Sequence, residues 1–189
     1  MILTPDNEYA AVLDACVLIP MPLCDTLLRL AEEPAMYRPL WSETILQEVG
    51  DGLEKKLKHT PEQKQRRIQA MRSAFPEAAI SVPEGLCGAL TCVPDERDRH
   101  VLAAAIRGGA HVIVTQNTKH FPEECLAQYN VLCHTPDDFL VHQFHLSAEQ
   151  VLEKLDAQAA ALHKERPHVI EKLKAMTPNF CHLVEQWSS

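Results

Sequence analysis

The feature that most constrains the fold is a regular alternation of short apolar runs with segments of helical periodicity. The first apolar run covers residues 9–19, and Asp14 is its only charged residue. Continuous apolar runs are typical of strands that a parallel sheet buries on both faces. Similar runs predict strands at residues 78–82, 111–115 and 130–134. We therefore expect an α/β fold of three layers, with a central parallel β-sheet of about four to five strands flanked by helices.

Capping residues place the helices between these strands. Ser42 and Ser147 are good N-cap residues, and Gly108-Gly109 is a common signal for a helix C-terminus. We expect helices at residues 23–32, from Ser42 to about residue 57, from Thr60 to near Phe75, from Asp95 to Gly108, from Thr135 onward and from Ser147 to about residue 164. Pro167 and Pro178 divide the remaining tail into short helices. A chain of 189 residues is long enough for one well-buried core.

The helix that begins near Asp95 places carboxylates on its apolar side. Asp98, Val101, Leu102 and Ala105 fall on one stripe, with Asp95 at its edge. An ionised Asp that points toward a core is costly unless something compensates its charge, and a divalent cation is the usual compensation. The alternative is structural, with Asp95 as an N-cap and Asp98 stabilised by the helix dipole.

Further candidate site residues lie where strands are expected to end. Asp14 sits among apolar neighbours in the first run, which favours an active-site carboxylate over a buried structural one. Asn117 follows the strand at residues 111–115, where a turn-forming Asn is the simpler interpretation. Glu48 lies beside Ile45 on its helix, so patterning alone predicts that it is solvated. An aspartyl phosphatase would need a second Asp two residues after Asp14, and that residue is Cys16.

Charge is unevenly distributed along the chain. The net charge is −8, yet residues 55–72 carry about +6, because only Glu62 opposes the basic residues there. These basic residues are Lys55, Lys56, Lys58, Lys64, Arg66, Arg67 and Arg72. They form either a patch for a phosphate-bearing or acidic partner or a solvated helical face. The aromatic content of 5% argues against a long stacking platform for bases.

Cysteine usage and hydropathy indicate a cytoplasmic protein. The seven cysteines are an odd number without a Cys-x-x-Cys pair, which favours reduced thiols over a disulfide framework or a thiolate zinc site. We expect no signal peptide and no membrane span, because the apolar stretch at residues 10–23 is too short and contains Asp14. His142 and His145 are expected to be a surface pair rather than zinc ligands.

Four short motifs in this order resemble a PIN domain over about residues 9–140. They are Leu13-Asp14-Ala15-Cys16-Val17-Leu18, then Ser42 with Glu48, then Asp98-x-x-Val-Leu-Ala-Ala-Ala, then Val-x-Val-Thr-x-Asn117. The chain looks most like PIN proteins of the VapC toxin type, in the branch with Thr-x-Asn-x-x-x-Phe-Pro, here residues 115–122. The tail resembles the helical extension of that branch. This implies a PIN-like nuclease domain at residues 1–140 and a helical C-terminal extension at residues 141–189.

The resemblance implies a metal-dependent endoribonuclease that is the toxin of a type II toxin–antitoxin system. Asp14, Glu48 and Asp98 match the three main acidic positions of the family, and Asn117 stands where many members carry a fourth Asp. One or two Mg²⁺ or Mn²⁺ ions would activate a water that hydrolyses RNA phosphodiesters, with Asp14 and Asp98 as direct ligands. Glu48 would hold a metal-bound water or act as a base. The expected partners are RNA, a cognate antitoxin and a second copy in a homodimer.

Two positions depart from the family pattern. Asn117 lowers the negative charge of the site by one, and His120 stands where this branch often has an acid before Phe-Pro. Asp95, His120 and Thr115 are expected as auxiliary site residues, with His120 either contacting a phosphate or having no role. The alternative function is a catalytically degenerate PIN domain that binds protein or RNA.

Overall fold

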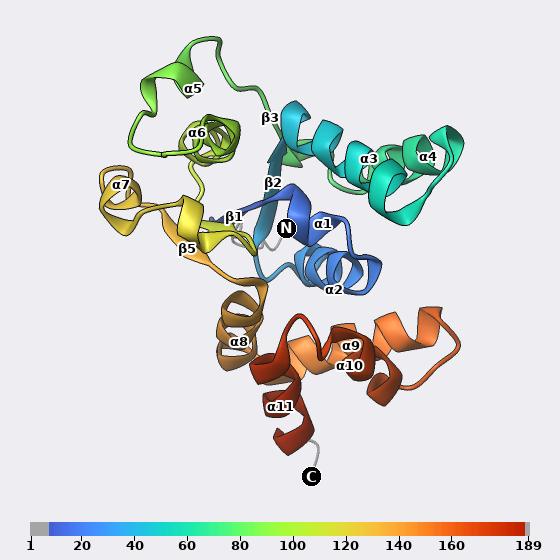
Figure 1. Ribbon diagram of the computed structural model, residues 1–189. Coiled ribbons are helices and arrows are strands. Elements are labelled where there is room, and N and C mark those ends of the chain that lie inside the picture. Colours follow the sequence, from blue (N-terminus) through green and yellow to red (C-terminus); the bar gives the residue numbers. More distant parts are fainter. Residues whose placement is uncertain (1–7, 188–189) are drawn as a thin grey trace, which may run out of the picture.

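The computed structural model describes residues 8–187 and contains a five-stranded parallel sheet (Figure 1). Its strands are β1 (Ala10–Leu13), β2 (Arg38–Ser42), β3 (Ala79–Ile80), β4 (Val112–Val114) and β5 (Leu132–His134). Their order in space is β3-β2-β1-β4-β5, so Val12 of the central strand pairs with Leu40 and Ile113. Parallel strands end at one edge, and the residues after β1 and β4 therefore lie together. The predicted parallel α/β fold is confirmed.

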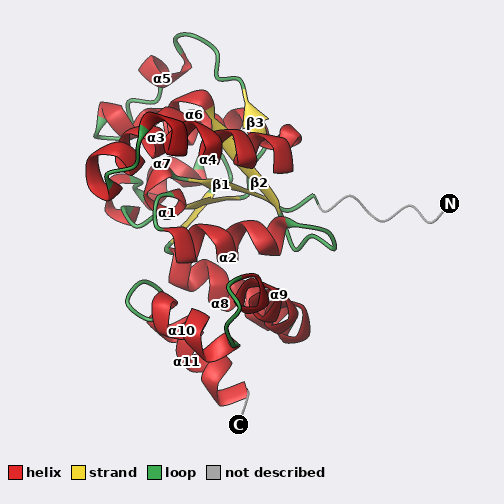
Figure 2. Cartoon of the chain, turned by 90° about the vertical axis from the view of Figure 1, so that its right-hand side faces the viewer, coloured by secondary structure: helices red, strands yellow, loops and turns green. Residues whose placement is uncertain are grey.

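Helices cover both faces of the sheet and extend beyond it (Figure 2). They are α1 (Ala15–Leu18), α2 (Met21–Ala31), α3 (Glu43–Leu57), α4 (Pro61–Ala74), α5 (Leu86–Ala89), α6 (Arg99–Gly108), α7 (Glu123–Ala127), α8 (Pro136–Leu146), α9 (Ala148–Ala161), α10 (Arg166–Leu173) and α11 (Pro178–Trp187). Helix α6 packs on β1, β2 and β4 from one side, and α2 lies on the other side. Helices α8–α11 form a further layer beyond α2.

The first strand is shorter than predicted. β1 ends at Leu13, and the chain enters the one-turn helix α1 directly after Asp14. Ala15, Val17 and Leu18 of α1 are buried, so the apolar run continues through a helix. A short apolar run cannot distinguish a buried strand from a buried helix, which explains the error. Asp14 therefore lies at the carboxyl end of β1 rather than inside a longer strand.

Two other strands differ from the prediction. β2 was not predicted, because its second residue is Pro39, which lacks an N–H and normally argues against a central strand. In the structure β2 pairs with β1 on one side and with β3 on the other. The strand predicted at residues 78–82 is only the two-residue β3, and it forms an edge of the sheet rather than a core strand.

The predicted helix caps are confirmed. Ser42 Oγ accepts a hydrogen bond from the backbone N–H of Ile45, and Thr60 forms a reciprocal capping box with Gln63. Gly109 ends α6 with φ of 62°, a left-handed conformation that favours glycine. These local interactions fix where α3, α4 and α6 begin or end, and so they position the residues at the sheet edge.

The C-terminal helices are joined to the rest of the fold by buried polar contacts. Thr26 of α2 donates to Oε1 of Gln158 in α9 at 2.8 Å. Buried Asp137 of α8 accepts from the backbone N–H groups of Asn179 and Phe180, which caps α11. The predicted boundary after residue 140 falls inside α8, and the division into two units stays a prediction. Within residues 8–187, no helix is both long and apolar enough to cross a bilayer.

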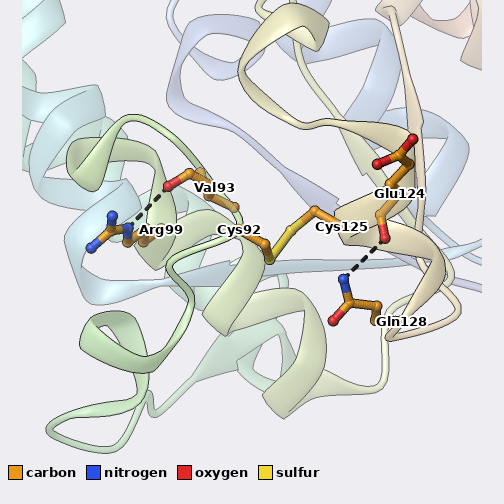
Figure 3. The surroundings of a disulfide bond; sticks show 6 residues. All are labelled: Cys92, Val93, Arg99, Glu124, Cys125 and Gln128. Carbon is orange, nitrogen blue, oxygen red and sulfur yellow. Dashed lines mark hydrogen bonds between the residues drawn. A yellow bond between two sulfur atoms is a disulfide. The ribbon is translucent and has the colours of Figure 1, made fainter.

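A disulfide bond joins Cys92, in the loop before α6, to Cys125 in α7 (Figure 3). The prediction of reduced thiols throughout the chain is therefore wrong for this pair. Their Cα atoms are 5.4 Å apart although 33 positions separate them, and a sequence without an alignment does not show such proximity. In the same loop the carbonyl of Val93 accepts a hydrogen bond from Arg99 Nε at 3.0 Å. The segment between Cys92 and Arg99 is thus held at both ends.

Candidate active site

Asp14 is a buried carboxylate at the carboxyl end of the central strand. Only 8% of its surface is exposed, and its backbone N–H donates to the carbonyl of Val114 at 3.1 Å. Its Oδ2 accepts from Thr115 Oγ1 at 2.6 Å and from Cys16 Sγ at 3.0 Å. Both side-chain donors use the same oxygen, and no hydrogen bond from the described residues reaches Oδ1. The second oxygen of Asp14 is therefore available to a ligand.

Cys16 acts as a hydrogen-bond donor in this arrangement. Burial raises the pKa of the Cys16 thiol to about 12, with the negative charge of Asp14 as the next cause. The thiol therefore stays protonated at neutral pH and is not a thiolate nucleophile. Its sulfur also accepts from the backbone N–H of Gln116 at 3.2 Å, which links α1 to the loop after β4. Sequence reasoning gave Cys16 no role in the site.

A second group of ligand atoms lies at the start of α6. His120 Nδ1 is 2.6 Å from Asp98 Oδ2, and ligand atoms of Asp95, Asp98 and His120 all lie within 4.8 Å of one another. Asp95 also caps the preceding 3-10 turn, because its Oδ1 accepts from the backbone N–H of Arg97. Hydrogen bonds from Arg97 lower the pKa of Asp95 to about 2. Asp98, by contrast, makes no side-chain capping bond, so its carboxylate faces His120 instead.

One loop connects the two groups. Thr115 at its start bonds to Asp14, and His120 at its end bonds to Asp98. Within the loop the backbone N–H of Asn117 donates to Thr115 Oγ1 at 3.0 Å, and the carbonyl of Asn117 accepts from the N–H of His120 at 2.9 Å. The side chain of Asn117 is exposed, and no hydrogen bond of the described chain involves it. The loop thus brings Asp14 and Asp98 to the same edge of the sheet.

Glu48 approaches the site from α3. Its Oε1 is 3.1 Å from His100 Nε2 on the first turn of α6, two residues after Asp98. The Glu48 side chain is 44% exposed, whereas that of His100 is only 12% exposed. Glu48 is therefore half solvated, as its helical position predicted, yet it is tied to the helix that follows Asp98. Glu48 and Asp14 lie outside the group formed by Asp95, Asp98 and His120. His100 was missed because nothing in its local sequence separates it from a surface histidine.

The basic stretch on the α3–α4 hairpin is largely paired. Lys55 bonds to Asp51 at 2.9 Å, Lys64 to Glu54 at 3.2 Å, and Arg72 to Glu43 at 2.6 Å. Arg67 donates to the carbonyl of Leu18 at 2.5 Å. The exposed cations of the stretch that make no such contact within the described chain are Lys56, Lys58 and Arg66. Acids just before the stretch therefore neutralise part of the positive charge that residues 55–72 carry by themselves.

Comparison with known proteins identifies the family of the chain. The PIN-domain family model matches residues 10–119, which is more than half of the chain. The chain belongs to the PIN-domain family. The matched PIN region runs from β1 to the loop after β4, and it contains Asp14, Glu48, Asp98 and Asn117. His120 and helices α8–α11 lie beyond the matched residues.

The chain is also similar to a curated protein. It is 43% identical over 81 residues to "Putative ribonuclease VapC50" of Mycobacterium tuberculosis (strain ATCC 25618 / H37Rv). The aligned region is 38% of this chain and 48% of that protein, so the chain matches about half of its relative's length. The predicted resemblance to a VapC-type PIN protein is confirmed.

Proposed function

We propose that this PIN-domain protein is a metal-dependent endoribonuclease and the toxin of a toxin–antitoxin pair. The observation that carries the proposal is the loop at residues 115–120, which hydrogen-bonds to Asp14 at one end and to Asp98 at the other. Two acids held by one loop at the carboxyl edge of a parallel sheet form a site for cation-assisted hydrolysis. The VapC50 similarity supports RNA as the substrate.

The donor atoms suit a hard divalent cation. Asp14 has an oxygen without a hydrogen bond from the described chain, and Asp98 and Asp95 add carboxylates at the same edge. Mg²⁺ and Mn²⁺ both prefer carboxylate and water oxygens, so Asp14 and Asp98 would hold such an ion. When bound, the cation supplies positive charge that polarises a phosphodiester and favours deprotonation of the attacking water.

The protein's own residues position these groups. Thr115 and Cys16 fix the rotamer of Asp14, because both donate to the same oxygen. Glu48 is proposed to accept a proton from the attacking water, and His100 orients its carboxylate. The exposed carboxamide of Asn117 can donate a hydrogen bond to a phosphate oxygen. Each residue therefore has a task that its observed contacts permit.

RNA recognition is proposed to use the phosphate backbone rather than base stacking. Lys56, Lys58 and Arg66 are the exposed cations of the α3–α4 hairpin that form no ion pair with residues 8–187, and we propose that they contact phosphates. The remaining partners of the proposal are an antitoxin that covers the acidic site and a second copy in a homodimer. A degenerate binding module is the second candidate, because Asp98 and Asp95 are already engaged by His120 and Arg97.

A cleavage assay separates these functions. The purified full chain is incubated with a pool of structured RNAs in Mg²⁺ or Mn²⁺, beside Asp14→Asn and the control Glu153→Gln, an exposed acid on α9. A nuclease cuts in a cation-dependent manner, loses cutting in Asp14→Asn and keeps it in Glu153→Gln. If no variant cuts and calorimetry detects no Mn²⁺ binding, the degenerate binding module is correct instead.

A further inference from the structure

A nitrogen ligand lies beside the carboxylates of the proposed site. His120 Nδ1 is 2.6 Å from Asp98 Oδ2, and Asp95 completes the group within 4.8 Å. Across residues 8–187 this is the only group of three His, Cys, Asp or Glu side chains with such spacing. Its members come from two segments, one before α6 and one after β4. The fold, rather than local sequence spacing, therefore creates the group.

The spacing of the three atoms suits a single cation. Ligands of one ion with bonds of about 2.0–2.2 Å lie at most about 4.4 Å apart. The three side chains are all within 4.8 Å of one another, so they need to approach one another only slightly to share an ion.

The contacts that Asp95 and Asp98 make in the structure involve exposed partner side chains. The His120 side chain is 44% exposed, and the side chain of Arg97, which pairs with Asp95, is 87% exposed. Exposed ion pairs contribute little to stability, because solvent screens them and ordering long side chains costs entropy. A cation that takes the place of Arg97 at Asp95 therefore displaces a weak interaction.

The two segments that supply the ligands are cross-linked. Cys92 is three positions before Asp95, and Cys125 is five positions after His120. Their disulfide joins the loop before α6 to α7, as Figure 3 shows. The bond from Arg99 Nε to the Val93 carbonyl holds the same loop against α6. A rigid framework of this kind reduces the entropy that ligand binding would otherwise cost.

We propose that Asp95, Asp98 and His120 form a cation site that prefers Mn²⁺ to Mg²⁺, with His120 Nδ1 as a nitrogen ligand. Mg²⁺ favours oxygen ligands and keeps several waters, whereas an imidazole suits first-row transition metals. A carboxylate at residue 120 would make the affinities of the site for Mn²⁺ and Mg²⁺ more similar. The proposal rests on the proposed function only in sharing Asp98 with the catalytic site.

Pulsed electron paramagnetic resonance of Mn²⁺ bound to the full chain tests the nitrogen ligand directly. We expect the modulation of an imidazole ¹⁴N in the wild type, its loss in His120→Ala, and its retention in His145→Ala. His145 is a matched control because it is an exposed histidine in the last turn of α8. Absence of the modulation in the wild type, or its persistence in His120→Ala, overturns the proposal.

Calorimetry of Mg²⁺ and Mn²⁺ binding tests the preference. We expect His120→Ala to raise the Kd for Mn²⁺ about tenfold or more and to change the Kd for Mg²⁺ less than about threefold. His120→Asp should reduce the difference between the Kd values for Mn²⁺ and Mg²⁺. An equal loss for both ions in His120→Ala would show that His120 only supports the site, and it would overturn the proposal.

Neither measurement depends on RNA. A wild type that shows the ¹⁴N modulation but never cuts RNA retains the Mn²⁺ site and contradicts the proposed nuclease. A wild type that cuts RNA without any nitrogen ligand retains the nuclease and contradicts the Mn²⁺ site.

Discussion

Thr115 Oγ1 donates a hydrogen bond of 2.6 Å to Asp14 Oδ2, although the two residues are 101 positions apart in the chain. Thr115 is fully buried, and its oxygen also accepts from the backbone N–H of Asn117. The hydroxyl therefore fixes one oxygen of Asp14 and the first turn of the loop at once. This contact makes the geometry of the carboxylate depend on the loop that follows β4.

Replacement of Thr115 by Val should destabilise the protein by about 2 kcal/mol, because a buried carboxylate loses its shortest donor and the N–H of Asn117 loses its acceptor. Thr115→Ser keeps the hydroxyl and loses only a methyl, for a cost of about 1 kcal/mol. Urea unfolding of both variants measures the difference. If Thr115→Val is as stable as Thr115→Ser, the hydrogen bond does not hold Asp14.

Cys16 should make stability depend on pH in the alkaline range. Its pKa rises from a usual value near 9 to about 12 in the folded protein. Between those values the unfolded chain loses the proton and the folded chain keeps it, so stability falls as pH rises above 9. At pH 10 the wild type should lose about 1 kcal/mol relative to its stability at pH 8, whereas Cys16→Ser lacks this loss.

Unfolding curves of both proteins at pH 8 and pH 10 test this expectation, since other ionisable groups contribute equally and cancel in the comparison. A constant difference between the two proteins would mean that Cys16 titrates alike in both states. That result would contradict the assignment of the Cys16 thiol as a hydrogen-bond donor to Asp14.

Glu48 should affect the rate of RNA cleavage far more than stability. Glu48→Gln removes the proposed base, so we expect the single-turnover rate to fall by about 100-fold or more. His100→Ala frees Glu48 from its partner and should slow cleavage by about tenfold. Glu48→Gln should unfold within about 0.5 kcal/mol of the wild type, because the Glu48 side chain is 44% exposed. His100→Ala truncates a side chain that is only 12% exposed and should cost about 1–2 kcal/mol, so its cleavage rate is compared under conditions in which both proteins are folded. Cleavage by Glu48→Gln at the wild-type rate would exclude the assigned role.

The cations of the α3–α4 hairpin that form no ion pair with the described residues should determine how salt affects RNA binding. Alanine at Lys56, Lys58 and Arg66 should reduce the slope of log affinity against log salt by about 2, at about 0.7 per phosphate contact on single strands. The matched control removes the paired cations Lys55 and Arg72 together with Lys64, which changes net charge equally. Equal slopes for the two triple variants would contradict the distinction between free and paired cations.

The disulfide should contribute substantially to stability. A loop closed over 33 positions corresponds to about 3–4 kcal/mol in the chain-entropy account. Cys92→Ser with Cys125→Ser should therefore lower the unfolding free energy by about that amount, as denaturant unfolding would measure. Cys87→Ser, a change at a half-buried free cysteine, is the control. If the double variant unfolds like the wild type, the cross-link does not constrain the unfolded chain.

Local patterns predicted those parts of the fold that local interactions determine. Ser42 and Thr60 cap helices as expected, and Gly109 ends α6. Asp14 was predicted as a site residue because a single carboxylate interrupts an apolar run, where an uncompensated charge is unfavourable, and its role stays a prediction. Strand β2 was missed because it contains Pro39, and proline has a low strand propensity.

Contacts between distant residues could not be predicted from one sequence. The partners of Asp98 and Glu48 are His120 and His100, and nothing in local spacing identifies either pair. The same holds for the disulfide, whose cysteines meet only when α7 packs beside the loop before α6. The basic residues at positions 55–72 suggested a positive patch. Acids outside that range, such as Glu43, neutralise part of its charge.

Mn²⁺ affinity of Asp14→Asn, Asp98→Asn and the double variant tests most directly whether the two acids form one cation site. If both carboxylates hold the same ion, each single variant loses about tenfold or more, and the double variant loses little beyond the worse single variant. Calorimetry on the full chain gives the three dissociation constants. An Asp14→Asn variant that binds Mn²⁺ as tightly as the wild type would show that Asp14 and Asp98 do not hold the same ion, and it would contradict the account.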